Sequence, residues 1–208
     1  MKEGGSEKNG DNKHSSISSK KYKPLIFSLI LIVFTVNPLV EELMNINIIP
    51  YMLAHYSLFI SGILIGYFYS VLKRSPWHLI PGVALGVLWH LPFFFNLGAI
   101  YLYIRIVEEF TLFLGGLLLG TSLHCVNNTV KILLFALWMV GDTYLSALFM
   151  ISPLSYTRVY PPSQTSITGI IMFLLMNTIV VFILLEYMYR YMVKEEKEFE
   201  QKSGQKAV

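Results

Sequence analysis

The sequence has few of the residues on which soluble or disulfide-stabilised proteins depend. Among its 208 residues there is a single cysteine, Cys125, so no disulfide can form within the chain and no CxxC metal or redox motif exists. Charged residues make up only 14% of the chain, whereas 54% are hydrophobic. Because soluble domains carry more charge and less apolar surface, this composition predicts an integral membrane protein.

The chain also lacks a basic surface of the kind that binds nucleic acid. Its formal net charge is +3, but the basic residues lie mainly in the two tails and in short loops, as membrane orientation requires. We therefore expect the lipid bilayer, and not a nucleic acid, as a partner of this protein.

Long apolar runs are what the sequence has in abundance. Six of them approach the roughly 20 residues that a helix needs to cross a bilayer. Short connections predict that they are antiparallel neighbours in one all-α transmembrane bundle. The predicted spans are at about 24–44, 51–72, 77–97, 99–121, 130–151 and 167–190.

The two ends of the chain are polar. Residues 1–23 are rich in Ser, Gly, Lys and Asn without apolar periodicity, which predicts a disordered tail before the six-helix domain at 24–190. Residues 191–208 form a second, charged tail. Lysine and arginine gather on the side of these tails, and only Arg158 lies in a loop on the other side. Both termini are thus predicted to be cytoplasmic, in a multi-pass protein of the cell membrane.

Several ionisable side chains interrupt the predicted spans. At 1.5 Å per helical residue, they fall roughly 6–15 Å from the outer end of the bundle. Hydrocarbon strongly disfavours such groups, so their presence is typical of a functional site. These residues are His55, His90, Arg105, Glu108, Glu109 and Asp142.

Two imidazoles and several carboxylates are able to hold a metal ion. Neutral imidazole binds zinc, copper, iron and nickel, and carboxylates complete a zinc site or favour harder ions. Arg105, Glu108 and Glu109 also share one helix face. A buried ion network in which Arg105 neutralises one of these carboxylates therefore explains the same residues. A proton or solute path is the third alternative.

Four stretches carry a family resemblance: Tyr51–Leu72, Trp89–Leu123, Lys131–Pro161 and Gln164–Phe173. In this order they resemble the conserved blocks of the CtaG family, and the chain looks like a distant archaeal branch of it. That family comprises polytopic membrane proteins implicated in the assembly of cytochrome c oxidase on its copper side. The resemblance implies a non-enzymatic protein that helps to assemble a respiratory heme-copper oxidase, or to load its copper, with oxidase subunits as partners.

The resemblance also points to site residues. His55 matches the histidine of the family's second helix, and His90 lies in its Trp-His-x-Pro block. Glu108 matches the glutamate of a His-x-x-Glu-His pattern, whose two histidines are replaced here by Arg105 and Glu109. This departure weakens a copper site directly. Taken with the intramembrane charges, the predicted metal, copper or alternatively zinc, would be held by His55, His90, Glu108, Glu109 and Asp142.

A second resemblance suggests an enzyme. The Trp-His-Leu-Pro stretch at His90 and the segment His124–Asn128 look like the WHLP and HxxxN motifs of the CAAX-protease and bacteriocin-processing family. The EExxxR motif of that family is incomplete, because Glu41–Glu42 lead to Ile46 where arginine is required. The predicted depths also place the two histidines too far apart to share one catalytic water. An intramembrane metalloprotease and an ion or proton transporter are the alternatives.

Overall fold

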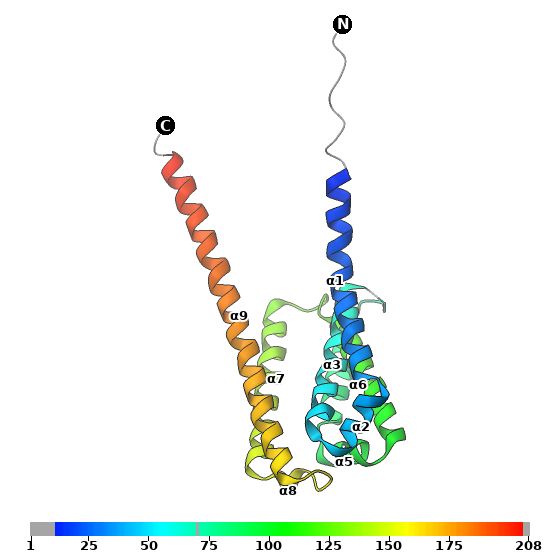
Figure 1. Ribbon diagram of the computed structural model, residues 1–208. Coiled ribbons are helices and arrows are strands. Elements are labelled where there is room, and N and C mark those ends of the chain that lie inside the picture. The colour runs from blue at the N-terminus through cyan, green and yellow to red at the C-terminus, as the bar shows by residue number, and fades with distance from the viewer. Residues whose placement is uncertain (1–10, 70, 206–208) are drawn as a thin grey trace.

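All regular structure in the described part of the protein is helical. The computed structural model describes residues 11–69 and 71–205, and no strand occurs in them (Figure 1). The elements are α1 (Asp11–Thr35), α2 (Pro38–Ile46), α3 (Ile48–Phe68), the 3₁₀ helix η1 (Pro76–His78), α4 (Leu79–Leu88), α5 (Pro92–Ile100), α6 (Leu102–Ser122), α7 (Asn128–Ile151), α8 (Pro153–Tyr156) and α9 (Pro162–Gln205). The predicted all-α class is confirmed for these residues.

Several helices are long and apolar enough to cross a membrane. They are α3, α7 and the Pro162–Phe199 part of α9. Two bent helix pairs raise the number of candidate spans from 3 to 5 if each pair is one span. Helix α6 is not among these candidates, since it carries Arg105, Glu108 and Glu109 within its 21 residues. The long apolar helices suggest a membrane protein, and six crossings stay a prediction.

Two of the predicted spans are not continuous helices. The span at 24–44 is divided between α1 and α2, which meet at 58°, and the span at 77–97 is divided between α4 and α5, which meet at 67°. Asn37 begins α2 because its side-chain oxygen accepts hydrogen bonds from two backbone amides of the first turn. Pro92 stands in the first turn of α5, where its ring prevents α4 from continuing. Each of these two predicted spans is therefore a pair of helices joined at a bend.

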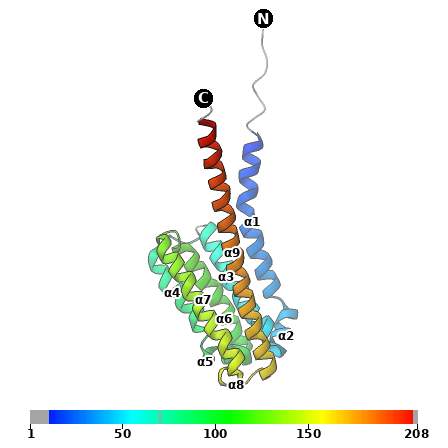
Figure 2. The same ribbon diagram turned by 90° about the vertical axis from the view of Figure 1, so that its left-hand side faces the viewer.

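Helices α1 and α9 extend beyond the same end of the bundle (Figure 1 and Figure 2). Helix α1 begins at Asp11, inside the segment predicted to be disordered, and residues 1–10 of that prediction lie outside the described residues. Helix α9 continues to Gln205, through most of the predicted charged tail. The N-terminal end of α1 and the C-terminal end of α9 therefore lie on the same side of the bundle.

The centre of the bundle is the pair of helices α3 and α6. A Cβ atom added at Gly116 of α6 would lie well under 3.0 Å from the backbone oxygen of Phe59, and one at Gly62 of α3 would lie equally close to the backbone oxygen of Phe113. The two backbones are thus in direct contact, as at other small-residue interfaces in membranes. This close packing brings side chains of α3 and α6 together without intervening residues.

Candidate functional site

The centre of the site is a contact between His55 of α3 and Glu108 of α6. His55 Nε2 lies 2.6 Å from Glu108 Oε1, and the two side chains are only 3% and 0% exposed. His55 Nδ1 lies 2.7 Å from the backbone oxygen of Tyr51, one turn earlier on α3. A carbonyl oxygen can only accept, so Nδ1 carries a hydrogen. The contact between Nε2 and Oε1 therefore holds one further proton, which makes the pair neutral as a whole.

Tyr51 binds the second carboxylate oxygen of Glu108, and Gly98 leaves room beside it. The Tyr51 hydroxyl donates to Glu108 Oε2 at 2.6 Å, and it lies 3.2 Å from the backbone oxygen of Phe95 in α5. A Cβ atom at Gly98 would collide with both Glu108 Oε2 and the Tyr51 hydroxyl. Glycine at this position thus allows α5 to pack directly against the centre.

Arg105 lies one turn before Glu108 on α6 and binds the end of α5. Its Nε donates to the backbone oxygen of Gly98 at 3.1 Å, and a terminal nitrogen donates to that of Ala99 at 2.8 Å. The last carbonyl groups of a helix have no partner within the helix. Because the arginine side chain is 1% exposed, it satisfies these groups where water is excluded.

The other terminal nitrogen of Arg105 reaches α2. It donates to Asn45 Oδ1 at 2.9 Å and lies 3.4 Å from Glu41 Oε2. Glu109 interacts with the same Glu41 and with Arg105. The ion-pair partner of Arg105 is thus Glu41, and not a carboxylate of its own helix as the ion-network alternative supposed. Arg105, Asn45, Glu41 and Glu109 thus form a separate group, called the outer cluster below. Glu109 belongs to this group and does not contact the histidines.

His90 lies at the break between α4 and α5. Its Nδ1 is 2.6 Å from the backbone oxygen of Gly86, and its own backbone oxygen accepts a hydrogen bond from Tyr156 at 2.5 Å. The centroid of its ring is 5.7 Å from that of His55. Both imidazoles are therefore held through Nδ1 by a carbonyl group one turn earlier, so Nε2 is the atom that each can offer to a ligand.

Asp142 is separate from this centre. It is on α7, and its Oδ1 accepts a hydrogen bond from the hydroxyl of Tyr56. Tyr56 directly follows His55 in the chain, so α3 presents one side chain to a carboxylate on α6 and the next to a carboxylate on α7. Of the five predicted ligands, the fold brings His55, His90 and Glu108 together and leaves Glu109 and Asp142 in other contacts.

Buried tyrosines surround the centre, and sequence reasoning did not select them. Tyr160 donates to the backbone oxygen of Met44 at 2.6 Å. Tyr156 donates to the backbone oxygen of His90, at the break between α4 and α5. Both come from the segment that follows α7, which the sequence analysis treated as a loop. The four tyrosines with 1–8% exposure are Tyr51, Tyr56, Tyr156 and Tyr160. Helix α8 ends at Tyr156, so no helical spacing in the sequence marks Tyr156 and Tyr160 as members of one face.

The donor atoms can be compared with what a metal ion requires. Two imidazole nitrogens and a carboxylate suit copper or zinc. Within the described residues, however, no group of three or more His, Cys, Asp or Glu side chains is arranged to hold a metal ion. Two ligands of one such ion are about 3 Å apart, and His55 Nε2 and Glu108 Oε1 are 2.6 Å apart. The donors are of the right kind, and metal binding would have to displace the shared proton.

His124 lies near the opposite end of α6. Its Nε2 is 2.6 Å from the backbone oxygen of Tyr67, and its ring stacks on that of Tyr67 with centroids 4.3 Å apart. At 1.5 Å per residue, the part of α6 between Glu108 and its C-terminal end is about 20 Å long. His90 lies at the Glu108 end, so the two histidines of the protease resemblance are well separated.

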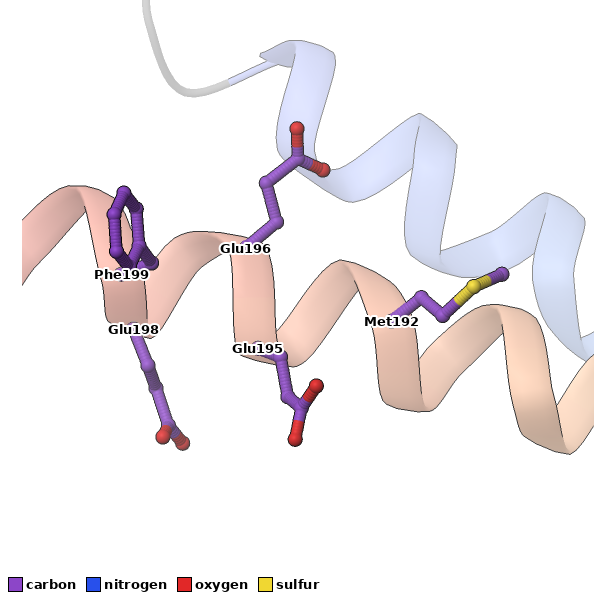
Figure 3. A pocket seen from close by; sticks show the side chains of 5 residues that line it. All are labelled: Met192, Glu195, Glu196, Glu198 and Phe199. Carbon is purple, nitrogen blue, oxygen red and sulfur yellow. The ribbon is translucent and has the colours of Figure 1, made fainter.

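A surface recess lies away from the centre, on the C-terminal part of α9. It is open and is lined by Met192, Glu195, Glu196, Glu198 and Phe199. Figure 3 shows Glu196 on one side of the helix and Glu195 and Glu198 on the opposite side. None of the predicted site residues lines this recess.

The family of the chain follows from a match over most of its length. The family model described as "Protein of unknown function (DUF1404)" matches residues 26–190, a range that contains every residue of the candidate site. No curated protein and no solved structure matches the chain. Because the matched range covers well over half of the sequence, this protein belongs to the DUF1404 family.

Proposed function

We propose that this protein is a CtaG-like protein of the cell membrane that assists the assembly of a respiratory heme-copper oxidase. The four sequence blocks support this role. One structural observation carries the proposal further: His55 and His90, the two histidines of the resemblance, lie with ring centroids 5.7 Å apart. Both are held through Nδ1 in the way that ligating histidines usually are, and Glu108 contacts one of them.

The proposed topology has six crossings with both termini in the cytoplasm. Each bent helix pair is one crossing, and α6 is another in spite of its charges. Arg105 and Glu108 are 1% and 0% exposed, so neighbouring helices shield them from lipid, as intramembrane charges require. In this topology the centre lies in the outer half of the bundle, where an oxidase subunit that receives copper outside the membrane would be in reach.

In this proposal the metal is cargo. Copper, or alternatively zinc, would be held by His55, His90 and Glu108. Since Nδ1–H of each histidine is engaged, Nε2 would be the ligating atom. The proton between His55 and Glu108 would leave when the metal binds, so uptake would be stronger at higher pH. Glu109 and Asp142 take no part, because their contacts lie elsewhere.

A proton or ion path is the second candidate function. The observation that favours it is the distance of 2.6 Å between His55 Nε2 and Glu108 Oε1, which suits a proton without any rearrangement. Tyr51 extends this contact by its hydrogen bond to Glu108. Hydrogen-bonded imidazole, carboxyl and phenol groups are the usual components of intramembrane proton relays. We do not propose a protease, because His90 lies beside the Glu108 end of α6 and His124 lies just beyond its other end.

Deletion of the gene tests the assembly role. We expect membranes of the deletion strain to lose most of their heme-copper oxidase activity and the matching heme absorbance, since an oxidase without copper is inactive. The wild-type gene should restore both, as should His124→Ala, which alters a histidine far from the centre. His55→Ala and His90→Ala should not restore them. Normal oxidase activity in the deletion strain would contradict the proposal.

A further inference from the structure

Asp142 has an unusual environment for an intramembrane carboxylate. Its side chain is 7% exposed, and although Oδ1 accepts a hydrogen bond from Tyr56, Oδ2 has no hydrogen-bond partner among the described residues. An ionised carboxylate without a cation beside it is strongly disfavoured in a membrane interior. Asp142 therefore requires a positive charge from another source.

Ser146 adds a second oxygen without a partner. It lies one turn after Asp142 on α7, so both side chains are on the same helix face. Ser146 is 0% exposed, and its hydroxyl has no partner within the part of the chain that the structure describes. Buried hydroxyl groups in helices normally donate to the carbonyl one turn earlier, as Thr121 does to Leu117 at 2.8 Å. Two adjacent buried polar groups that lack partners call for an explanation.

The helices packed against this face bring oxygen atoms and no cation. Helix α3 contributes the hydroxyl of Tyr56, which donates to Asp142. Helix α9 approaches with Gly169, beside the backbone of Ser146. Arg105 is engaged by α2 and α5, and in the described residues no basic side chain forms an ion pair with Asp142.

We propose that Asp142 and Ser146 of α7, together with the Tyr56 hydroxyl of α3, form a second site, which binds one monovalent cation through oxygen atoms. The cation is either a proton carried by Asp142 or a Na⁺ ion, and both supply the single positive charge that one carboxylate needs. Hard cations prefer oxygen ligands, and intramembrane Na⁺ and H⁺ sites are built from such groups. This site shares no ligand with the metal centre, and the inference does not depend on the oxidase role.

Infrared difference spectroscopy of the full-length protein in lipid nanodiscs tests the site. In Na⁺-free buffer we expect a carbonyl stretching band from a protonated carboxylic acid. The component of this band that belongs to Asp142 should disappear in Asp142→Asn and persist in Glu109→Gln, which alters a carboxyl group of the outer cluster. If the variant Asp142→Asn does not fold, Tyr56→Phe removes the hydrogen bond to Oδ1 and should shift the frequency of the same component.

Titration with NaCl, with choline chloride as the control salt, separates the two cations. If Na⁺ occupies the site, it bleaches the Asp142 component in the wild type, and Ser146→Ala needs a roughly tenfold higher Na⁺ concentration because one ligand is lost. If the site carries only a proton, NaCl leaves the component unchanged. The proposal is overturned if no component depends on Asp142 or Tyr56 and Na⁺ has no effect on the wild type.

Discussion

Replacement of Arg105 by alanine is expected to unfold most of the protein. The side chain links α6 to the end of α5, at Gly98 and Ala99, and to Asn45 and Glu41 of α2. Glu41 is 23% exposed, so loss of its ion pair costs less than the roughly 3–5 kcal/mol of a fully buried pair. Each buried carbonyl left unpaired adds about 1–3 kcal/mol. The short helices α2 and α5 would then detach from the centre.

Thermal unfolding of the purified protein in detergent, followed by circular dichroism, measures this effect. Arg105→Lys should be intermediate, since lysine keeps the charge but lacks the planar fork that reaches several acceptors. Arg190→Ala is the matched control: Arg190 is 76% exposed in its pair with Glu186, and exposed pairs contribute little. A melting curve of Arg105→Ala that equals the wild-type curve would show that α2 and α5 are held by other contacts.

Replacement of Gly116 by leucine is expected to separate α3 from α6. The added atoms would collide with the backbone of Phe59 and Ile63, which cannot move aside as a flexible side chain can. Overpacking of a core costs about 1–3 kcal/mol when side chains yield, so a collision with backbone should exceed this range. Because His55 and Glu108 come from these two helices, the centre would be lost together with the fold.

Gly141→Leu is the control for this prediction. No atom lies within 4 Å of a Cβ atom added at Gly141, so leucine meets open space there. Leucine also favours the helix by up to about 1 kcal/mol relative to glycine. The elution profile in detergent should thus be unchanged and the thermal stability equal or slightly higher for Gly141→Leu, whereas both should be lost for Gly116→Leu. Equal behaviour of the two variants would rule out the close contact of α3 and α6.

Hydropathy predicts where the long helices lie but does not show where they break. The runs that became α3, α7 and α9 are visible because each is apolar over the length of a bilayer. The break before Pro92 is not visible, because α5 is as apolar as an uninterrupted span. The break before Pro38 is hidden because the two glutamates of α2 stand where a span would end in any case. Irregular backbone at membrane depth is tolerated where protein covers it, and at His90 that cover is supplied by Tyr156.

Depth along a helix is a weaker guide to a site than direction around it. Glu108 and Glu109 have nearly the same depth, yet successive helical residues point about 100° apart, so Glu108 meets His55 and Glu109 meets Glu41. Asp142 has a similar depth on α7 but faces Tyr56. Neither direction can be derived from hydropathy, because it depends on which helices are neighbours in the folded bundle.

The most direct test of the central claim, that His55, His90 and Glu108 form one metal-handling centre, is the metal content of the purified full-length protein. The protein is exposed to copper or zinc, unbound metal is removed, and the remainder is measured by mass spectrometry. We predict about one ion per chain in the wild type and in His124→Ala, with affinity at least tenfold weaker in His55→Ala and His90→Ala. A wild-type protein that retains no metal, or variants that retain as much as the wild type, would contradict the claim.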